Sequence, residues 1–182
     1  MKPIFTLHAG EFVFGEHVEK RFRNVNLWVP TKDTGIDFLL SDKANGATVS
    51  VQVKMSRDYR PPHAATNFDN FLEAAGWFVF SRKALEGSQA DIWSIVLVSH
   101  QRKSQPIFVN LPPSELLRKL VAIHGWQKNY HLYPWVTAVG CLEGRGMRKA
   151  DKAKLVDGDF DLGERDLSRY LDNWSFIEQL HG

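Results

Sequence analysis

The hydrophobic pattern between Ala9 and Arg23 predicts an amphipathic helix. On a wheel of about 3.6 residues per turn, one stripe carries Glu11, Gly15, Val18 and Phe22. The opposite side carries Glu16, Glu19, Lys20 and Arg23. An acidic residue on a stripe that packs inward is unfavourable unless another group pairs with it. The pattern therefore singles out Glu11, rather than Glu16, as an acid with a function inside the protein.

Three strands are predicted to follow this helix. Residues 26–30 form a short apolar run that ends at Pro30, and residues 36–40 form a second run interrupted only by Asp37. Residues 48–54 alternate strictly between polar and apolar, as a strand does. The pair Asn45-Gly46 is typical of a hairpin turn. The expected order is helix, strand, strand, strand, with a hairpin joining the last two strands.

The remaining pattern predicts helices and strands in alternation. Residues 92–98 are a β-branched apolar run, typical of a central strand buried on both faces. The other expected elements are a helix over 67–85 (although 78–80 also fits a strand), a helix over 114–123, a strand over 135–139 and a final amphipathic helix over 167–177. Together these elements predict an α/β sandwich, with a mixed central β-sheet flanked by helices.

Composition is consistent with one domain spanning residues 1–182. The chain has 182 residues, of which 43% are hydrophobic, and this is enough for one sizeable core. The single cysteine, Cys141, excludes an internal disulfide and fits a reducing compartment. The first residues have no long apolar run, so we expect neither a signal peptide nor a membrane span. These features predict a cytoplasmic protein.

Charge gives a weaker indication of a partner. The net charge is only +2, but residues 144–154 contain five basic residues, among them Arg145, Arg148 and Lys149. Such a segment can follow a phosphate backbone, although a solvated loop explains the same charges. Past the third strand, Ser56, Arg57, Arg60 and His63 are open to the same two interpretations.

Candidate chemistry centres on Asp37, Gln52 and Lys54. Residues two apart on a strand project to the same face, so Gln52 and Lys54 point together, and the hairpin places Asp37 on the neighbouring strand. The inward stripe of the first helix brings Glu11 toward the same area. Carboxylate and amide oxygens suit Mg²⁺, and a lysine beside the metal can hold a water or stabilise charge on a phosphate.

Residues 9–54 resemble the PD-(D/E)XK nuclease superfamily. Gly35-Ile36-Asp37, the hairpin and Gln52-Val53-Lys54 look like its D…(E/Q)xK core, and Ala9-Gly10-Glu11-Phe12 looks like the first-helix glutamate of its Holliday-junction resolvase-like and restriction-like branches. The resemblance implies a restriction-endonuclease-like sandwich with an αβββαβ core. It also implies DNA hydrolysis by a metal-activated water, with Mg²⁺ (or Mn²⁺) held by Asp37, Gln52 and Glu11, and Lys54 near the water. A homodimer acting on duplex or branched DNA would be usual for this family.

The sequence departs from the family pattern at two positions. Ile36 replaces the usual proline before the aspartate, and Gln52 replaces the usual glutamate with a neutral amide. The second departure leaves open a catalytically degenerate nucleic-acid-binding module with the same fold. A third interpretation is an accidental motif on the wet face of a hairpin.

Overall fold

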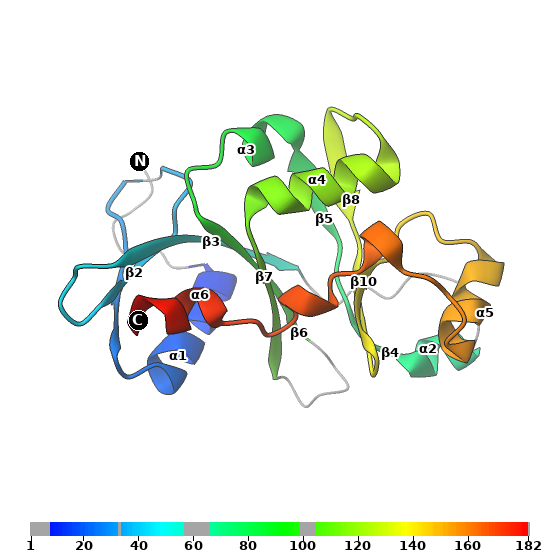
Figure 1. Cartoon of the computed structure of the whole chain (residues 1–182), viewed down its shortest axis with the longest axis horizontal. Helices are drawn as coiled ribbons and strands as arrows, with labels where there is room; N and C mark the ends of the chain where they lie inside the picture. Colours follow the sequence, from blue (N-terminus) through cyan, green and yellow to red (C-terminus); the bar gives the residue numbers. More distant parts are fainter. Residues whose placement is uncertain (1–7, 33, 57–65, 99–104, 182) are drawn as a thin grey trace.

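The computed structural model describes residues 8–32, 34–56, 66–98 and 105–181. Its centre is a five-stranded mixed sheet (Figure 1) in the order β1-β2-β3-β6-β7. These strands are β1 (Val25–Trp28), β2 (Phe38–Asp42), β3 (Thr48–Ser56), β6 (Ile92–Val98) and β7 (Pro106–Leu111). Neighbours pair antiparallel except β3 and β6, which are parallel. The mixed central sheet is confirmed.

Helices cover both faces of this sheet. Because side chains alternate along a strand, β6 directs Ile95 to one face and Val96 to the other, and both are buried. Val96 joins a core cluster with side chains of α1 (Ala9–Arg21) and α6 (Ser175–Glu178). Ile95 joins a second cluster with side chains of α3 (Arg82–Glu86) and α4 (Pro113–His124).

The predicted order of the first four elements agrees with the structure. The β2–β3 turn forms because Asp42 Oδ1 accepts hydrogen bonds from the backbone N–H groups of Gly46 (2.7 Å) and Ala47 (3.2 Å). Asn45 adopts a left-handed φ of 57°, which asparagine tolerates well. One boundary was wrong, because β2 begins at Phe38 and Asp37 therefore lies just before the strand.

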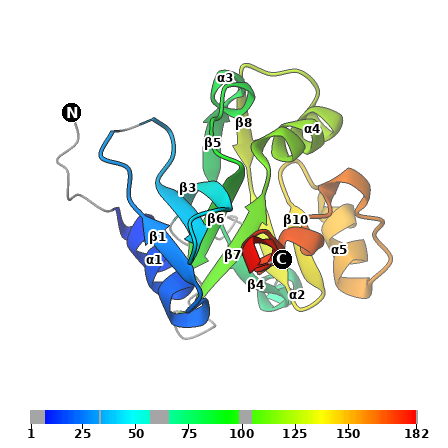
Figure 2. The ribbon, with the colours of Figure 1, turned by 60° about the vertical axis from the view of Figure 1, so that its left-hand side comes forward.

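The buried stripe of α1 differs from the predicted one. Gly10, Phe14 and Val18 are its buried residues, whereas Glu11 and Gly15 are half-buried. The helix is thus rotated by about one position relative to the predicted stripe. Figure 2 shows α1 alongside β1 and the edge of the sheet.

The helix predicted over residues 67–85 is wrong. The structure has α2 (Thr66–Phe71), β4 (Leu72–Ala75), β5 (Phe78–Ser81) and α3 in this region. Phe78 and Phe80 are buried whereas Val79 and Ser81 are exposed, which is the two-residue period of a strand. β5 pairs with β8 (Asn129–Leu132), and β4 pairs with β9 (Pro134–Thr137), which in turn pairs with β10 (Gly140–Glu143). Pairing with strands more than forty residues away outweighs the local helical pattern.

The final helix predicted over 167–177 is also wrong. The described chain has short turns there instead: η1 (Gly163–Arg165), η2 (Ser168–Tyr170), α6 and η3 (Gln179–His181). The backbone N–H of Asp172 donates to the carbonyl of Phe108, and Leu171 bridges to Val109, so this segment pairs with β7. Leu167, Tyr170, Trp174 and Ile177 are nevertheless buried, as their spacing suggested.

Two further features complete the described fold. α5 (Lys149–Asp157) is a helix where the charge pattern was also consistent with a solvated loop. No helix among the described residues has the length and apolar character needed to cross a bilayer.

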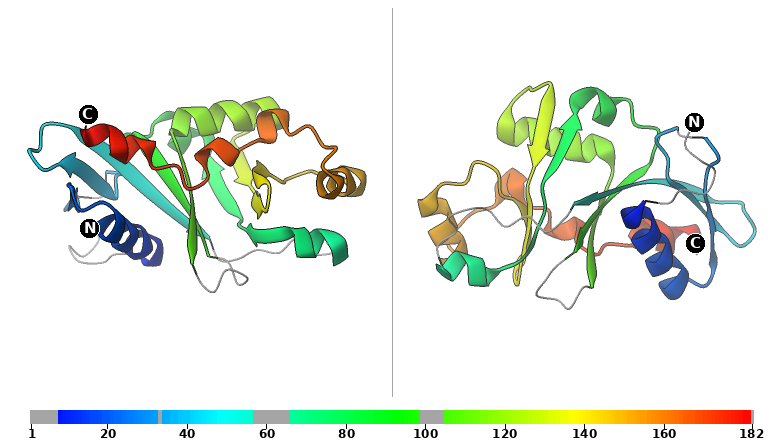
Figure 3. Two further views of the ribbon diagram at one scale, coloured as in Figure 1. Left: turned by 60° about the horizontal axis from the view of Figure 1, so that its bottom comes forward. Right: turned by 180° about the vertical axis from the view of Figure 1, so that it is seen from behind.

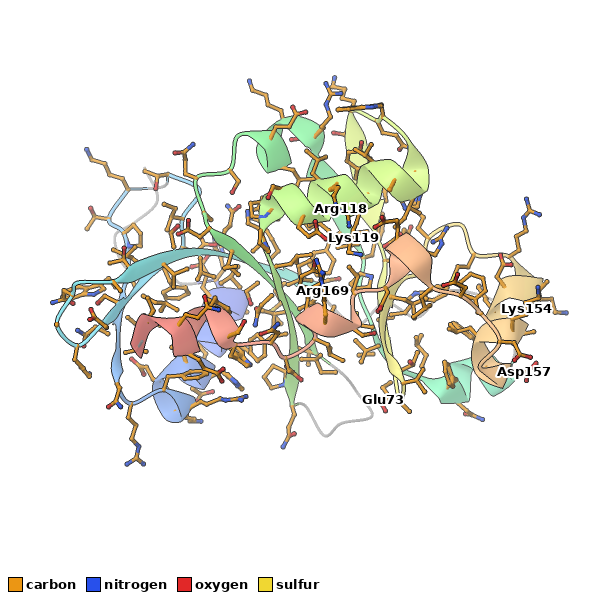
Figure 4. All side chains as sticks on the ribbon, in the orientation of Figure 1. Glu73, Arg118, Lys119, Lys154, Asp157 and Arg169 are labelled. Atoms are coloured by element: carbon orange, nitrogen blue, oxygen red, sulfur yellow. The ribbon has the colours of Figure 1, made fainter. Side chains whose placement is uncertain are left out.

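A charged network joins α4 to the turns near the C-terminus (Figure 4). The carboxylate of Glu115 accepts hydrogen bonds from Arg118 (2.8 Å and 3.0 Å), Tyr170 Oη (2.8 Å) and Arg169 (2.8 Å). Arg118 also reaches both carboxylate oxygens of Glu164. Hydrogen bonding from Arg118 is the main cause that lowers the pKa of Glu115 from 4.5 to about 2.

This network predicts an acid-dependent loss of stability. A carboxyl whose pKa is lower in the folded state stabilises the fold above its unfolded pKa, and this contribution disappears as the pH falls from about 4.5 toward 2. Glu115→Gln should lower the free energy of unfolding by about 1–2 kcal/mol at pH 7, since solvent screens the exposed arginines. In urea unfolding experiments, the difference in free energy of unfolding between Glu115→Gln and wild type should shrink toward zero near pH 2. The exposed Glu19→Gln is the control, and a difference independent of pH would contradict the prediction.

Candidate metal and catalytic site

A pocket of about 570 Å³ opens between the first turn of α1 and the second half of β3. It is lined by residues 8–11, Asp37 and residues 52–56. The four residues singled out from the sequence, Glu11, Asp37, Gln52 and Lys54, all lie in this lining. The structure thus brings together side chains from a helix, a loop and a strand.

β3 supplies two of these residues through its alternation. Val51 and Val53 are buried in the core beneath α1, whereas Gln52 and Lys54 are half-buried and line the pocket. Lys54 Nζ lies 5.7 Å from the ring centroid of Trp93, a fully buried residue of β6 that pairs in register with Gln52. The face of an aromatic ring attracts an ammonium, so Trp93 helps to position the Lys54 side chain.

Asp37 is held against β3 by its own hydrogen bonds. Its backbone N–H donates to the carbonyl of Val51 (2.9 Å), and its Oδ2 accepts from the backbone N–H of Val53 (2.7 Å). Gly35, two residues earlier, has a left-handed φ of 79°, which glycine adopts without strain. The carboxylate is therefore directed at the segment that carries Gln52 and Lys54.

Glu11 enters the pocket from the first turn of α1. Its Oε2 accepts the backbone N–H of His8 (3.1 Å), a contact that satisfies a free donor at the helix start. A carboxylate is also favourable there because of the helix dipole. Glu16, the competing acid, is exposed, pairs with Lys20 at 2.8 Å and does not line the pocket.

The donor set is compatible with a hard divalent cation. Asp37 and Glu11 offer carboxylate oxygens and Gln52 offers an amide oxygen, the ligand types that Mg²⁺ prefers. In the part of the chain that the structure describes, no three His, Cys, Asp or Glu residues cluster as a ready-made metal site. Waters and substrate phosphate oxygens would have to complete the coordination, as is usual for Mg²⁺.

Of the basic residues predicted to contact phosphate, those that the structure describes do not line this pocket. Arg148 and Lys149 are exposed at the start of α5, at the opposite end of the longest axis from α1 (Figures 1 and 3). Arg145 is half-buried, and its carbonyl accepts a hydrogen bond from Arg165. Arg57, Arg60 and His63 lie outside the described residues. A role for these residues in DNA binding stays a prediction.

Sequence reasoning missed three residues at or beside the pocket. His8 and Met55 line it, and Trp77 borders it because its backbone N–H donates to Ser56 Oγ (3.1 Å). The alternation of Trp77, Val79 and Ser81 with buried Phe78 and Phe80 would have revealed Trp77 as an outward-facing residue just before β5.

Comparison with known proteins gives little further information. No protein-family model and no curated protein sequence matches this chain. A solved structure described as a bacterial homing endonuclease, I-Ssp6803I, is similar over 93% of this chain and 88% of its own, with 12% identity and a TM-score of 0.43. A likeness this distant carries no argument about activity. The function therefore has to be inferred from the site itself.

Proposed function

We propose that this protein is a Mg²⁺-dependent endonuclease that hydrolyses phosphodiester bonds in DNA. The observation that carries the proposal is the shared pocket of Glu11, Asp37, Gln52 and Lys54. Residues separated by more than forty positions in the sequence meet there in the combination that metal-assisted phosphodiester hydrolysis requires. A chance D…QxK pattern on a wet hairpin face would give no reason for Glu11 to join the same pocket.

The resemblance to PD-(D/E)XK nucleases supports this proposal at the level of topology. α1 precedes the antiparallel strands β1, β2 and β3, and β6 then lies parallel to β3. This arrangement is compatible with an αβββαβ core in which α2, β4, β5 and α3 replace the single second helix. A homodimer, with one active site for each strand of a duplex, belongs to the same proposal.

Each side chain has a separate role in the proposed reaction. When bound, Mg²⁺ or Mn²⁺ would lower the pKa of water and neutralise charge on the phosphate. Asp37 and Glu11 would supply carboxylate oxygens to the cation, and Gln52 would supply its amide oxygen. Lys54 would orient the attacking water or stabilise the negative charge that develops on the phosphate. The hydrogen bond from Val53 to Asp37 keeps that carboxylate oriented before any ligand arrives.

Lys54→Ala tests this proposal directly. Wild type should cleave supercoiled plasmid, linear duplex or four-way-junction DNA with Mg²⁺ or Mn²⁺, and Lys54→Ala should lower the rate by about ten- to a hundredfold. Lys20→Ala, which removes an exposed lysine from the far end of α1 outside the pocket, is the matched control and should cleave normally. Equal cleavage by wild type and Lys54→Ala would refute the role of Lys54.

The second candidate function is nucleic-acid binding without turnover. The observation that favours it is the neutral Gln52 amide, which leaves the pocket with two carboxylates. Wild-type protein that binds DNA but cleaves none of the three substrates with either metal would support this candidate over the nuclease.

A further inference from the structure

The outer face of the two-stranded sheet β5/β8 carries one exposed and two half-buried aromatic residues next to the pocket. In β5 and just before it, Val79 and Trp77 are 53% and 45% exposed. In β8 and just after it, His131 and Tyr133 point to the same side, because Val79 pairs with His131 and side chains alternate along a strand. Figure 3 shows this two-stranded ribbon, green and yellow, beside the central sheet.

The rings of Trp77, His131 and Tyr133 lie next to one another, and we call this group the aromatic platform. Trp77 Nε1 donates to His131 Nδ1 (3.1 Å), and the two ring planes differ by 15°. An indole N–H and an imidazole lone pair both lie in their ring planes, so this bond places the rings edge to edge rather than face to face. The planes of the Tyr133 and Trp77 rings differ by 11°, and their centroids are 6.3 Å apart.

The aromatic platform is continuous with the proposed catalytic pocket. Ser56 lines the pocket, and its Oγ accepts the backbone N–H of Trp77. A strand bound to the aromatic platform would therefore lie beside the pocket, on the side where Ser56 lies.

Basic residues lie at the end of the β5/β8 sheet where β5 ends and β8 begins. Beyond Ser81, Arg82 lies 4.9 Å from the ring of Trp126, which is 69% exposed. Lys83 and Lys128 are exposed beside them, and the nearby acid Glu86 pairs with Arg82. Exposed rings alternating with cations are the combination by which proteins bind single-stranded nucleic acid.

We infer that the aromatic platform stacks unpaired nucleobases and that the substrate has a single-stranded segment beside the cleaved phosphate. The faces of bases inside a duplex are covered by their neighbours, so away from the ends of a duplex only an unpaired base can stack on these rings. The inference rests on the proposed function for its cleavage step, but the stacking itself does not require turnover. It narrows the substrate to branched, flapped or single-stranded DNA.

Binding measured without turnover tests the inference. The probes are fluorescently labelled forked DNA with an unpaired arm, a single strand and a blunt duplex of equal length, measured by anisotropy in EDTA. Wild type should prefer the forked and single-stranded probes, and Trp77→Ala should weaken their binding by roughly 5- to 150-fold, with little change for the blunt duplex. Trp77→Phe, which keeps a stacking ring, should recover most of this loss. Trp28→Ala is the matched control, since Trp28 is 51% exposed on β1 and does not line the pocket.

The outcomes separate this inference from the proposed nuclease function. Loss of forked-DNA binding in Trp77→Ala supports the aromatic platform even if no DNA is cleaved, in which case only the nuclease proposal fails. Unchanged forked-DNA binding by Trp77→Ala overturns the inference, even if wild type cleaves DNA in Mg²⁺. A wild-type dimer that Trp77→Ala converts to a monomer, with forked-DNA binding unchanged, would overturn it in favour of a contact between protein copies. Circular dichroism of both Trp77 variants establishes that they are folded.

Discussion

Asp37→Asn should reduce DNA cleavage by about a thousandfold while leaving the fold intact. A metal ion contributes several kcal/mol of charge stabilisation in such reactions, and about 4 kcal/mol corresponds to three orders of magnitude in rate. The substituted amide keeps an oxygen that can accept the N–H of Val53, so the structural hydrogen bond at 2.7 Å can persist. What disappears is one of the two carboxylate charges in the pocket.

Metal-dependent thermal stability separates this effect from misfolding. A ligand that binds only the folded state raises the melting temperature, and the stabilisation grows with the logarithm of the ligand concentration relative to the dissociation constant. Wild type should therefore melt at a higher temperature when Mg²⁺ or Mn²⁺ is added, and Asp37→Asn should show much less of this rise but the same melting temperature in EDTA. Asp159→Asn, at an exposed position outside the pocket, is the control for loss of one carboxylate charge. Full activity in Asp37→Asn would remove Asp37 from the proposed metal site.

Gly10→Ala should damage the site, whereas the same substitution at Gly15 should not. A Cβ at Gly10 would lie 2.6 Å from Met55 Cβ, which is fixed to the backbone of β3 and cannot rotate away. The added methyl group therefore forces α1 away from β3, and Glu11 moves with it. Overpacking of this kind costs about 1–3 kcal/mol of stability, and a displacement of about 1 Å can lower a rate by about a hundredfold.

Gly15 provides the matched control within the same helix. A Cβ there would lie 3.6 Å from Phe38 Cζ, an ordinary van der Waals contact. Alanine is favoured over glycine in a helix by up to about 1 kcal/mol, so Gly15→Ala should stabilise the protein and leave cleavage unchanged. Urea unfolding and plasmid cleavage measured on both variants check the pair. If Gly10→Ala were as stable and active as Gly15→Ala, the close approach of α1 to β3 would not position the site.

The candidate site could be predicted from the sequence where one element's own periodicity decided the outcome. Alternation alone placed Gln52 and Lys54 on one side of β3, and helical spacing favoured Glu11 over Glu16. The wheel nevertheless gave the wrong buried stripe, since Gly10 rather than Gly15 packs most tightly. The approach of Gly10 to Met55 joins residues 45 positions apart, and no local pattern contains it.

The least predictable parts were those in which distant strands pair. Residues 67–85 have local features of a helix, but β5 pairs with β8 about fifty residues later and β4 pairs with β9 more than sixty residues from Leu72. Residues 167–177 keep their buried positions without forming a helix, because hydrogen bonds to β7 direct the backbone.

Local periodicity thus determined β3, β6, α4 and the faces that the pocket residues occupy, because alternation and helical spacing depend only on near neighbours. Tertiary structure alone decided how Asp37 is fixed against Val53, where α1 meets β3, and that Trp77 lies beside His131, 54 residues away. These arrangements arise from packing and hydrogen bonds between segments far apart in the chain. A short stretch of sequence does not include both partners of such a contact, so the contact cannot be predicted from local patterns.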